Sequence, residues 1–367
     1  MATWRTESYK FPGVSFGTSG LVASRGGTAH VVGDRMLSFA PPLAKRWDGT
    51  GWMTFPLAIP GPPANAVVPT SLVNDVDGHA HDDLWAVGSF SYWFGSTCYE
   101  RAMICRWNGV DWSFANAYNA GDYYDQLLAV CARHPQATWA VGITRGKPTS
   151  ERQPLAQYWD GSNWRGTTTP AFPGENAVLR DVAAMPDGTA WAVGYVDVGT
   201  APARPLAMFW DGSSWVTHNP SPPNGGGAFE SVVMIHRGEA WAFGTQGAYP
   251  SDHAYVCRWN GSNWREWPLR PIADRDLING AVAVSDTDIV AVGGYEETYR
   301  IHPFVWHWDG SIWREEPVPD IPVAGSATPP TGTQYFHAAS HADGTYWAAG
   351  ILINTSGQFE LLIGRAR

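Results

Sequence analysis

The stretch Asn176-Ala-Val-Leu-Arg-Asp-Val-Ala-Ala-Met-Pro-Asp-Gly-Thr-Ala-Trp-Ala-Val-Gly-Tyr-Val, followed by Pro205-Leu-Ala-Met-Phe-Trp-Asp-Gly-Ser-Ser-Trp-Val-Thr-His-Asn-Pro220, decides the fold. It contains four runs rich in apolar, aromatic and β-branched residues, separated by Asp-Gly or proline-marked turns. The runs cover residues 178–185, 190–196, 206–210 and 214–218, and we name them strands a to d. This pattern predicts a four-stranded antiparallel meander.

The unit recurs along the chain, and tryptophan marks each copy. An Asp-Gly or Asn-Gly turn and a tryptophan open strand d at Trp52, Trp112, Trp164, Trp215, Trp264 and Trp313. A spacing of about 50 residues is typical of propeller and kelch repeats. Six copies are visible in this way.

A seventh copy is divided between the two ends of the chain. Strands a, b and c are expected at 334–341, 346–351 and 359–364, and the missing strand d stands at Thr3-Trp4-Arg5. Pairing the two ends removes an open sheet edge. We therefore predict an all-β, seven-bladed β-propeller in one domain, 1–367, with a closing strand at 1–9 and blades at about 14–58, 70–116, 123–168, 176–219, 228–268, 277–318 and 333–367.

Composition limits the partners. The net charge of −10 argues against nucleic acid and anionic membrane, because both need a basic surface. No apolar run approaches the length of a membrane span. A small-molecule or glycan ligand is the expected partner.

Cysteine usage and the N-terminus favour a cytoplasmic location. The four cysteines show no evident pairing, and the N-terminus has no charged-then-apolar leader. Secretion stays open if a signal peptide was replaced by Met1.

With its Trp-Asp-Gly-Ser-x-Trp turns, the chain resembles seven-bladed kelch-like and Asp-box-like propellers, including tryptophan-rich bacterial repeat proteins. The resemblance covers the whole chain and implies the propeller fold. Such propellers serve as lectins, lyases, hydrolases, oxidases and scaffolds, so the resemblance implies no single function.

The connections predict which face of the disc carries the site. The a-to-b and c-to-d links are short, whereas the b-to-c and d-to-a links are long and differ from blade to blade. Examples of the long class are 89–101, 145–154, 219–228, 295–303 and 319–333. Because variable loops on a rigid scaffold usually carry function, we expect one composite site at the central mouth of that face.

Most of the 21 tryptophans are expected to be structural, since they recur at fixed positions of strands b, c and d. Trp93, Trp267 and Trp306 fall outside this pattern and are the candidates for ligand stacking. Trp93 is the strongest of them, because it lies in a long link, although loop packing would also explain it.

The innermost strands supply the candidate catalytic residues. Aligning the copies on the strand b tryptophan places these pairs at one level: Ser19-Gly20, Asn74-Asp75, Leu128-Ala129, Arg180-Asp181, Glu230-Ser231, Asn279-Gly280 and Phe336-His337. His337 is the expected general base, with Asp181 or Glu230 as its partner and Arg180 holding an anionic group. The expected substrate-binding residues are Trp93, Tyr124, Asn279, Tyr295, Arg300, His302 and Tyr335. The alternative is a polar, water-filled tunnel without chemistry.

The segment Asp75-Val-Asp-Gly-His-Ala-His-Asp-Asp83 resembles the calcium loop of FG-GAP propeller repeats. The resemblance implies Asp75, Asp77 and Asp83 as side-chain ligands of a structural Ca²⁺, with the carbonyl of His81. His79 stands where that pattern has an oxygen ligand, so a transition-metal site and an ordinary polar turn stay open.

Two functions are compatible with these residues. One is an enzyme, a lyase, cyclase or hydrolase that uses acid/base chemistry on a small or medium polar organic substrate. The other is a non-catalytic propeller that binds a glycan or protein through the same loops. The sequence contains no Gly-rich phosphate loop, paired-cysteine zinc motif or Gly-x-Ser-x-Gly elbow.

Overall fold

The computed structural model describes residues 3–11, 15–36, 41–61, 66–147, 150–221, 223, 225–247, 251–297, 300–319, 321, 333–354 and 357–367. Within these ranges the chain is all-β, as predicted. No helix in this part of the chain is long and apolar enough to cross a membrane. The predicted link 319–333 lies mostly outside the described residues.

Five sheets have four antiparallel strands each. They are β2 (Ser15–Ser24), β3 (Thr28–Met36), β4 (Leu43–Trp47) and β5 (Trp52–Pro56); β14 (Asn176–Ala184), β15 (Ala190–Asp197), β16 (Arg204–Trp210) and β17 (Trp215–Thr217); β18 (Gly227–His236), β19 (Glu239–Gln246), β20 (His253–Trp259) and β21 (Trp264–Glu266); β22 (Arg275–Ser285), β23 (Asp288–Glu297), β24 (Arg300–Trp308) and β25 (Trp313–Glu316); and β26 (Thr333–Ala342), β27 (Thr345–Ile353), β28 (Phe359–Ala366) and β1 (Arg5–Tyr9). In the last sheet the N-terminal β1 pairs with the C-terminal β28.

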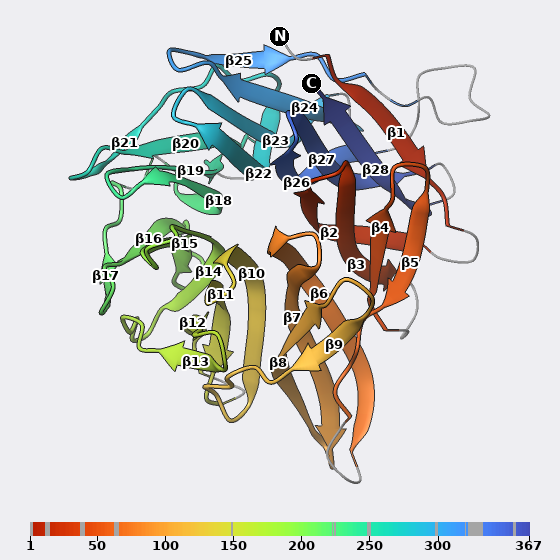
Figure 1. Cartoon of the computed structure of the whole chain (residues 1–367). Helices are drawn as coiled ribbons and strands as arrows, with labels where there is room; N and C mark the ends of the chain where they lie inside the picture. Colours follow the sequence, from red (N-terminus) through yellow and green to blue (C-terminus); the bar gives the residue numbers. More distant parts are fainter. Residues whose placement is uncertain are drawn as a thin grey trace.

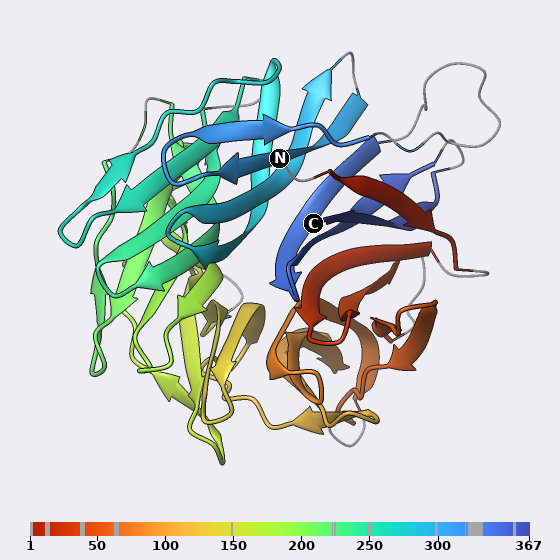
Figure 2. The same ribbon diagram turned by 45° about the horizontal axis from the view of Figure 1, so that its top comes forward.

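The sixth sheet has eight strands. It contains β6 (Val67–Ala80), β7 (Asp83–Phe94), β8 (Thr97–Trp107), β9 (Trp112–Ala115), β10 (Tyr124–His134), β11 (Ala137–Arg145), β12 (Gln153–Trp159) and β13 (Trp164–Thr167). The two halves are joined by one parallel pair, between Tyr124 and Glu100. Figures 1 and 2 show all the sheets arranged around a common centre, with β2, β6, β10, β14, β18, β22 and β26 innermost.

The tryptophan pattern has the structural role that the sequence predicts. Trp191 of β15 packs against Trp259 and Trp264 of the next sheet, with ring centroids 4.9 Å apart in both pairs. Trp241 packs in the same way against Trp308 and Trp313, at 5.0 and 5.6 Å. Aromatic pairs of this kind contribute about 0.5–1.5 kcal/mol each beyond their burial. The repeated tryptophans therefore join each sheet to its neighbour.

The short turns between strands c and d follow from their Asp-Gly sequences. At the β4–β5 turn, Asp48 Oδ1 accepts hydrogen bonds from the backbone N–H groups of Thr50 and Gly51, at 2.8 and 2.9 Å. Gly49 has a φ of +101°, which a side chain would strain. An acidic residue followed by glycine thus closes the hairpin.

Two of the predicted long links are hairpins instead. β7 continues to Phe94 and β8 begins at Thr97, so the segment 89–101 is a pair of strands joined by a two-residue turn. Tyr92 and Tyr99 face each other across this hairpin as a stacked pair, 5.4 Å apart. β-forming aromatic residues on both sides of Gly95 extend the pairing. The link 295–303 is similarly shortened, because β23 reaches Glu297 and β24 begins at Arg300.

Candidate functional site

A β-bulge interrupts every innermost strand at the same level. In β14, Leu179 pairs with Gly194 and Asp181 with Val193, so Arg180 has no partner across the strand pair. The corresponding bulged residues of the seven strands are Ser19, Asn74, Leu128, Arg180, Glu230, Asn279 and His337. A bulge turns its extra residue away from the regular alternation of side chains.

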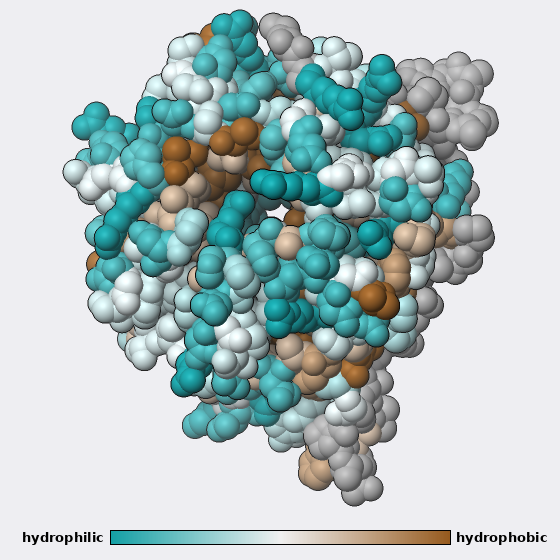
Figure 3. Space-filling model, viewed as in Figure 1, coloured by the Kyte–Doolittle hydropathy of each residue, from teal (hydrophilic) through white to brown (hydrophobic). Residues whose placement is uncertain are grey.

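All seven bulged residues line one central cavity of about 340 Å³. This volume lies at the lower end of the range for small-molecule sites. Figure 3 shows the centre of the disc as a narrow opening that is surrounded mainly by hydrophilic residues. The structure thus brings together the inner-strand residues that the sequence alignment placed at one level.

A glycine in each strand b makes the bulge possible. A Cβ atom on Gly194 would lie 2.0 Å from the carbonyl oxygen of Val178 on β14. The same contact is 1.9–2.1 Å at all seven equivalent positions, Gly33, Gly88, Gly142, Gly194, Gly244, Gly293 and Gly350. These glycines end the Ala-Val-Gly-like motifs of strand b. Their fixed position was the sequence signal for the bulges, which sequence reasoning missed.

Asn279 has a different role from the predicted one, although it lines the cavity. Its Nδ2 donates a hydrogen bond of 3.0 Å to the carbonyl of Phe336, the residue before His337. Asn74 and Ser19 donate in the same way to the residue before the next bulge, at 2.6 and 2.5 Å. Asn279 therefore holds the backbone that carries His337.

Arg180 and Glu230 form an ion pair inside the cavity, with Arg180 Nε 3.6 Å from Glu230 Oε2. Burial raises the pKa of Glu230, and the charge of Arg180 partly opposes that rise. The Arg180 guanidinium also lies 5.5 Å from the ring centroid of Tyr195. The pair places one titratable carboxyl and one permanent cation side by side.

His337 contributes a neutral imidazole, because burial lowers its pKa to about 4. Its Nε2 is buried without a hydrogen-bond partner among the described residues. The ring of Tyr335 packs against it edge-on, with centroids 4.5 Å apart. The alignment was wrong by one residue here: His337 stands at the level of Arg180, because the turn between β26 and β27 is shorter.

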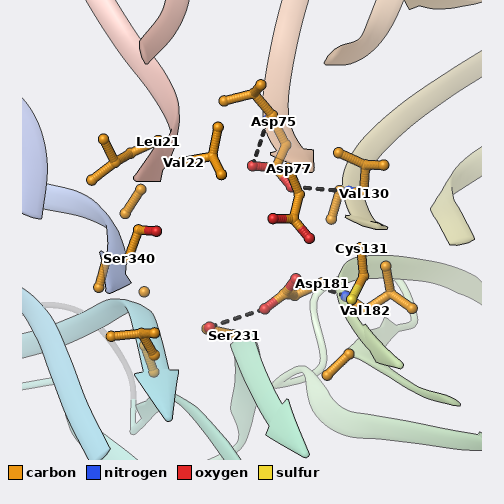
Figure 4. A pocket seen from close by; sticks show the side chains of 18 of the residues that line it. Leu21, Val22, Asp75, Asp77, Val130, Cys131, Asp181, Val182, Ser231 and Ser340 are labelled. Atoms are coloured by element: carbon orange, nitrogen blue, oxygen red, sulfur yellow. Dashed lines mark hydrogen bonds between the residues drawn. The ribbon is translucent and has the colours of Figure 1, made fainter. Parts of the chain in front are cut away.

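Asp181 is engaged in holding two strands together. One oxygen accepts from the N–H of Val232 at 2.8 Å and from the hydroxyl of Ser231 at 2.9 Å, both on β18 (Figure 4). The other accepts from the N–H of Val182 at 2.7 Å. Burial raises its pKa to about 6 even so. These bonds favour a structural role over the predicted partnership with His337.

The predicted calcium loop is a tight β-hairpin with a bulge at His79. Asp75 pairs with Val87 and Asp77 with Trp85, and only two residues separate β6 from β7. Asp75 Oδ2 accepts from Val130 N–H at 2.9 Å, and Asp77 Oδ2 from Ala132 N–H at 2.8 Å.

The other two residues of the calcium prediction also have separate neighbours. Asp83 makes a two-pronged pair with Arg106, at 2.8 Å for both bonds, and His81 lies 3.9 Å from Asp82. Among the described residues, no group of three or more His, Cys, Asp or Glu side chains is arranged to hold a metal ion. Calcium binding stays a prediction that this geometry does not favour.

The predicted loop residues lie away from the described lining of the cavity. Trp93 is 44% exposed on the β7–β8 hairpin. Tyr124 donates to Gln126 Oε1 at 2.8 Å, and Tyr295 stacks on His302 across β23 and β24, at 5.2 Å. Arg300 lies opposite Glu297 at the end of the same hairpin.

The two other tryptophan candidates are structural. Trp267 packs between Trp241 and Trp308, with centroids 5.5 and 5.0 Å away, and Trp306 is buried in the core.

Arg133 is a cavity residue that sequence reasoning missed. It is the extra residue of a second bulge in β10, between the pairs Ala132–Thr138 and His134–Ala137. The neighbouring Cys131 is the main cause of the raised pKa of Arg133, and Asp77, which projects toward the cavity in Figure 4, and Asp181 raise it further. Because the bulge depends on pairing across two strands, the sequence carried no signal for the direction of this side chain.

Known proteins resemble this chain in fold. No family model and no curated protein sequence matches it. Among solved structures, virginiamycin B lyase from Staphylococcus aureus is 10% identical with a TM-score of 0.58, covering 99% of both chains. An ulvan lyase of polysaccharide lyase family PL25, bound to -[GlcA(1-4)Rha3S]-, is 10% identical with a TM-score of 0.58, covering 97% of this chain and 95% of its own. YCF48 bound to D1 peptide is 14% identical with a TM-score of 0.55, covering 98% and 96%.

These neighbours are β-propellers and include both enzymes and a peptide-binding protein. At such low identity they establish that this chain has a β-propeller fold, and nothing narrower.

Proposed function

We propose that this chain is a seven-bladed propeller enzyme with one site in the central cavity. The eight-stranded sheet is counted as two blades, because a single residue pair joins its halves. The pairing of β1 with β28 completes the last blade and closes the ring. The observation that carries the proposal is the set of seven bulges, whose side chains differ and meet in one cavity.

Glu230 is the proton-transfer group in this proposal. A carboxyl whose pKa is raised by burial is suited to acid/base catalysis near neutral pH. This replaces Asp181, which accepts two hydrogen bonds from β18 and one from Val182, as the acidic partner in the site. His337 supplies a neutral hydrogen-bonding group in the same cavity, and Asn279 positions His337 through the preceding backbone carbonyl.

The substrate class is a small polar organic acid or a short acidic glycan. Arg180 already pairs with a carboxylate, so it is suited to share its guanidinium with an acidic group of a ligand. The reaction that fits is abstraction of a proton next to that group, with loss of a substituent from the neighbouring carbon. Virginiamycin B lyase and the ulvan lyase supply substrates worth including in the first trials.

The test is a lyase assay on a panel of glucuronate-containing polysaccharides and virginiamycin B, followed by the ultraviolet absorbance of a new conjugated double bond. Glu230→Gln keeps the shape and removes the acid, so we expect turnover to fall by about a hundredfold or more. Glu175→Gln is the matched control, because Glu175 pairs with Arg204 outside the cavity. Equal turnover in the wild type and Glu230→Gln would reject the assignment.

The second candidate is a propeller that binds a glycan or protein without converting it. Exposed aromatic side chains at the end of the β7–β8 hairpin favour it: Trp93 is 44% and Phe94 55% exposed. Trp93→Ala should then abolish retention on immobilised glycans or peptides. Tyr118→Ala, at an equally exposed residue elsewhere, should leave retention unchanged. Retention of both variants would exclude this surface.

A further inference from the structure

A second cavity, of about 240 Å³, lies away from the central one, at β19, β20 and β22. Its described lining has a polar part, Gln246, Ser251, His253 and Asp276, and an apolar part that includes Leu269 and Pro271. None of these residues belongs to the bulge level of the central cavity. The volume corresponds to roughly eight water-sized groups.

A histidine and an aspartate form a hydrogen-bonded pair in this cavity. His253 Nδ1 lies 2.8 Å from Asp276 Oδ1. The Asp276 side chain is only 1% exposed, whereas that of His253 is 32% exposed. When Nδ1 donates its proton to the carboxylate, Nε2 is left as a hydrogen-bond acceptor. The buried aspartate thus orients an accessible acceptor.

The charge of the buried Asp276 carboxylate is only partly balanced by hydrogen bonds. Its Oδ2 is buried and has no hydrogen-bond partner among the described residues. Burial raises its pKa, and the bond from His253 partly opposes the rise. A buried carboxylate oxygen without a partner is costly, so a nearby cation would be stabilising.

Among the described residues, carboxylates outnumber the one guanidinium that lies next to the pair. Arg275, the residue before Asp276, is shared between Asp252 at 2.7 Å and Glu296 at 3.6 Å. With Asp276, three carboxylates stand against one guanidinium. The local field therefore attracts positive charge.

We propose that this cavity is a second ligand site, which takes a small alkylammonium group. The ammonium donates to His253 Nε2 in the field of the Asp276 carboxylate, and the alkyl part packs on Leu269 and Pro271. The group comes from a free amine or from a lysine side chain of a partner protein. The site is independent of the function proposed for the central cavity.

Binding of n-butylammonium chloride, measured by saturation-transfer NMR on the full chain, tests the charge requirement. The neutral isostere 1-butanol serves as the comparison ligand. We expect n-butylammonium to bind and 1-butanol to show no saturable binding. Asp276→Asn should weaken the ammonium by about tenfold or more, since it removes the buried charge.

Three further variants separate loss of the site from folding defects. Asp252→Asn, which changes a nearby acid outside the lining, should weaken binding much less than Asp276→Asn. Leu269→Trp should abolish binding by filling the cavity, and circular dichroism checks that each variant is folded. Glu230→Gln, in the central cavity, should have no effect.

The source of the ammonium is decided with acetyl-Gly-Lys-Gly-amide. If this peptide binds as tightly as n-butylammonium, the site takes a lysine side chain, and if only the free amine binds, it takes a small molecule. Equal binding of n-butylammonium and 1-butanol, or unchanged binding by folded Asp276→Asn, would overturn the proposal.

Discussion

His307, on β24, lies between two carboxylates close to Trp4, the residue before β1. Its Nδ1 is 2.9 Å from Glu316 Oε1, and its Nε2 is 2.8 Å from Asp288 Oδ1. Glu316 also accepts from Trp4 Nε1 at 2.7 Å, and Asp288 accepts from the hydroxyl of Tyr346. Because carboxylates only accept, both contacts of His307 are hydrogen bonds only when the ring is an imidazolium. The hydrogen bond to Glu316 is the main cause of the raised pKa of His307.

His307→Gln removes this charge, and the size of the loss follows from the contacts. Hydrogen bonds to charged groups contribute about 1.5–3 kcal/mol each, and glutamine keeps at most one of the two and lacks the imidazolium charge. The Glu316 side chain is 2% exposed, so water does not replace the lost partner. We expect a loss of about 2–4 kcal/mol in unfolding free energy near pH 6.

The sign of the pH dependence is fixed by the raised pKa. The stabilisation is fully present below the unfolded value of 6.5 and is lost as pH rises through the higher folded value. At a second, alkaline pH above the raised folded pKa, the wild type has itself lost the proton, so the difference between wild type and His307→Gln should shrink.

Urea unfolding of both proteins at the two pH values measures the effect. Arg258→Gln is the matched control, because Arg258 pairs with Glu239 at 2.8 Å in the preceding sheet and stays charged throughout. Its cost should be similar at both pH values. A His307→Gln cost that is equal at both, or larger at the higher pH, would refute the reasoning.

Three further predictions test the fold around the cavity. Gly194→Ala should lower the unfolding free energy measured in urea by about 2 kcal/mol or more, because the new Cβ would lie 2.0 Å from a carbonyl oxygen. Gly51→Ala is the control, with nothing within 4 Å of the new Cβ, and should lower it by less than about 0.5 kcal/mol. Equal losses would contradict the argument that these glycines are needed for the bulges. His30→Phe should reduce the fall of the melting temperature between about pH 6.5 and pH 3. Burial lowers the pKa of His30 to about 3, so in this range the imidazole binds a proton in the unfolded protein but not in the folded one. If the melting temperature of His30→Phe falls as steeply as that of the wild type, another group causes the fall. Asp181→Asn should cost about 1–3 kcal/mol in urea unfolding, because its single amide oxygen cannot accept the two bonds from β18 and also the bond from Val182 N–H; no change would show that these bonds do not stabilise the fold.

The fold could be predicted from the sequence because its determinants are local and repeated. Asp-Gly and Asn-Gly turns fix the hairpins, and tryptophan at the same strand positions fixes the packing between sheets. Strands β5, β9, β13, β17, β21 and β25 each begin at the predicted tryptophan. The segment 89–101 was wrongly predicted as a loop, because the tryptophan repeat does not extend into it.

The site could be predicted only in part. Alignment on strand b found the level of Arg180, Glu230 and Asn279, because that level is set by counting residues from a repeated tryptophan. The bulge itself depends on which residues pair across two strands, so the direction of each side chain was not available from the sequence. For the same reason Asp181 was taken for a free carboxylate, although its bonds to β18 come from a neighbouring sheet.

The most direct measurement is a set of crystal structures after soaking with a library of small polar acids and polyols, sodium glucuronate included. The account predicts that bound molecules collect in the central cavity, in contact with Glu230, Arg180 or His337. Bound molecules found only outside that cavity, with the bulged side chains unchanged, would contradict a single central site.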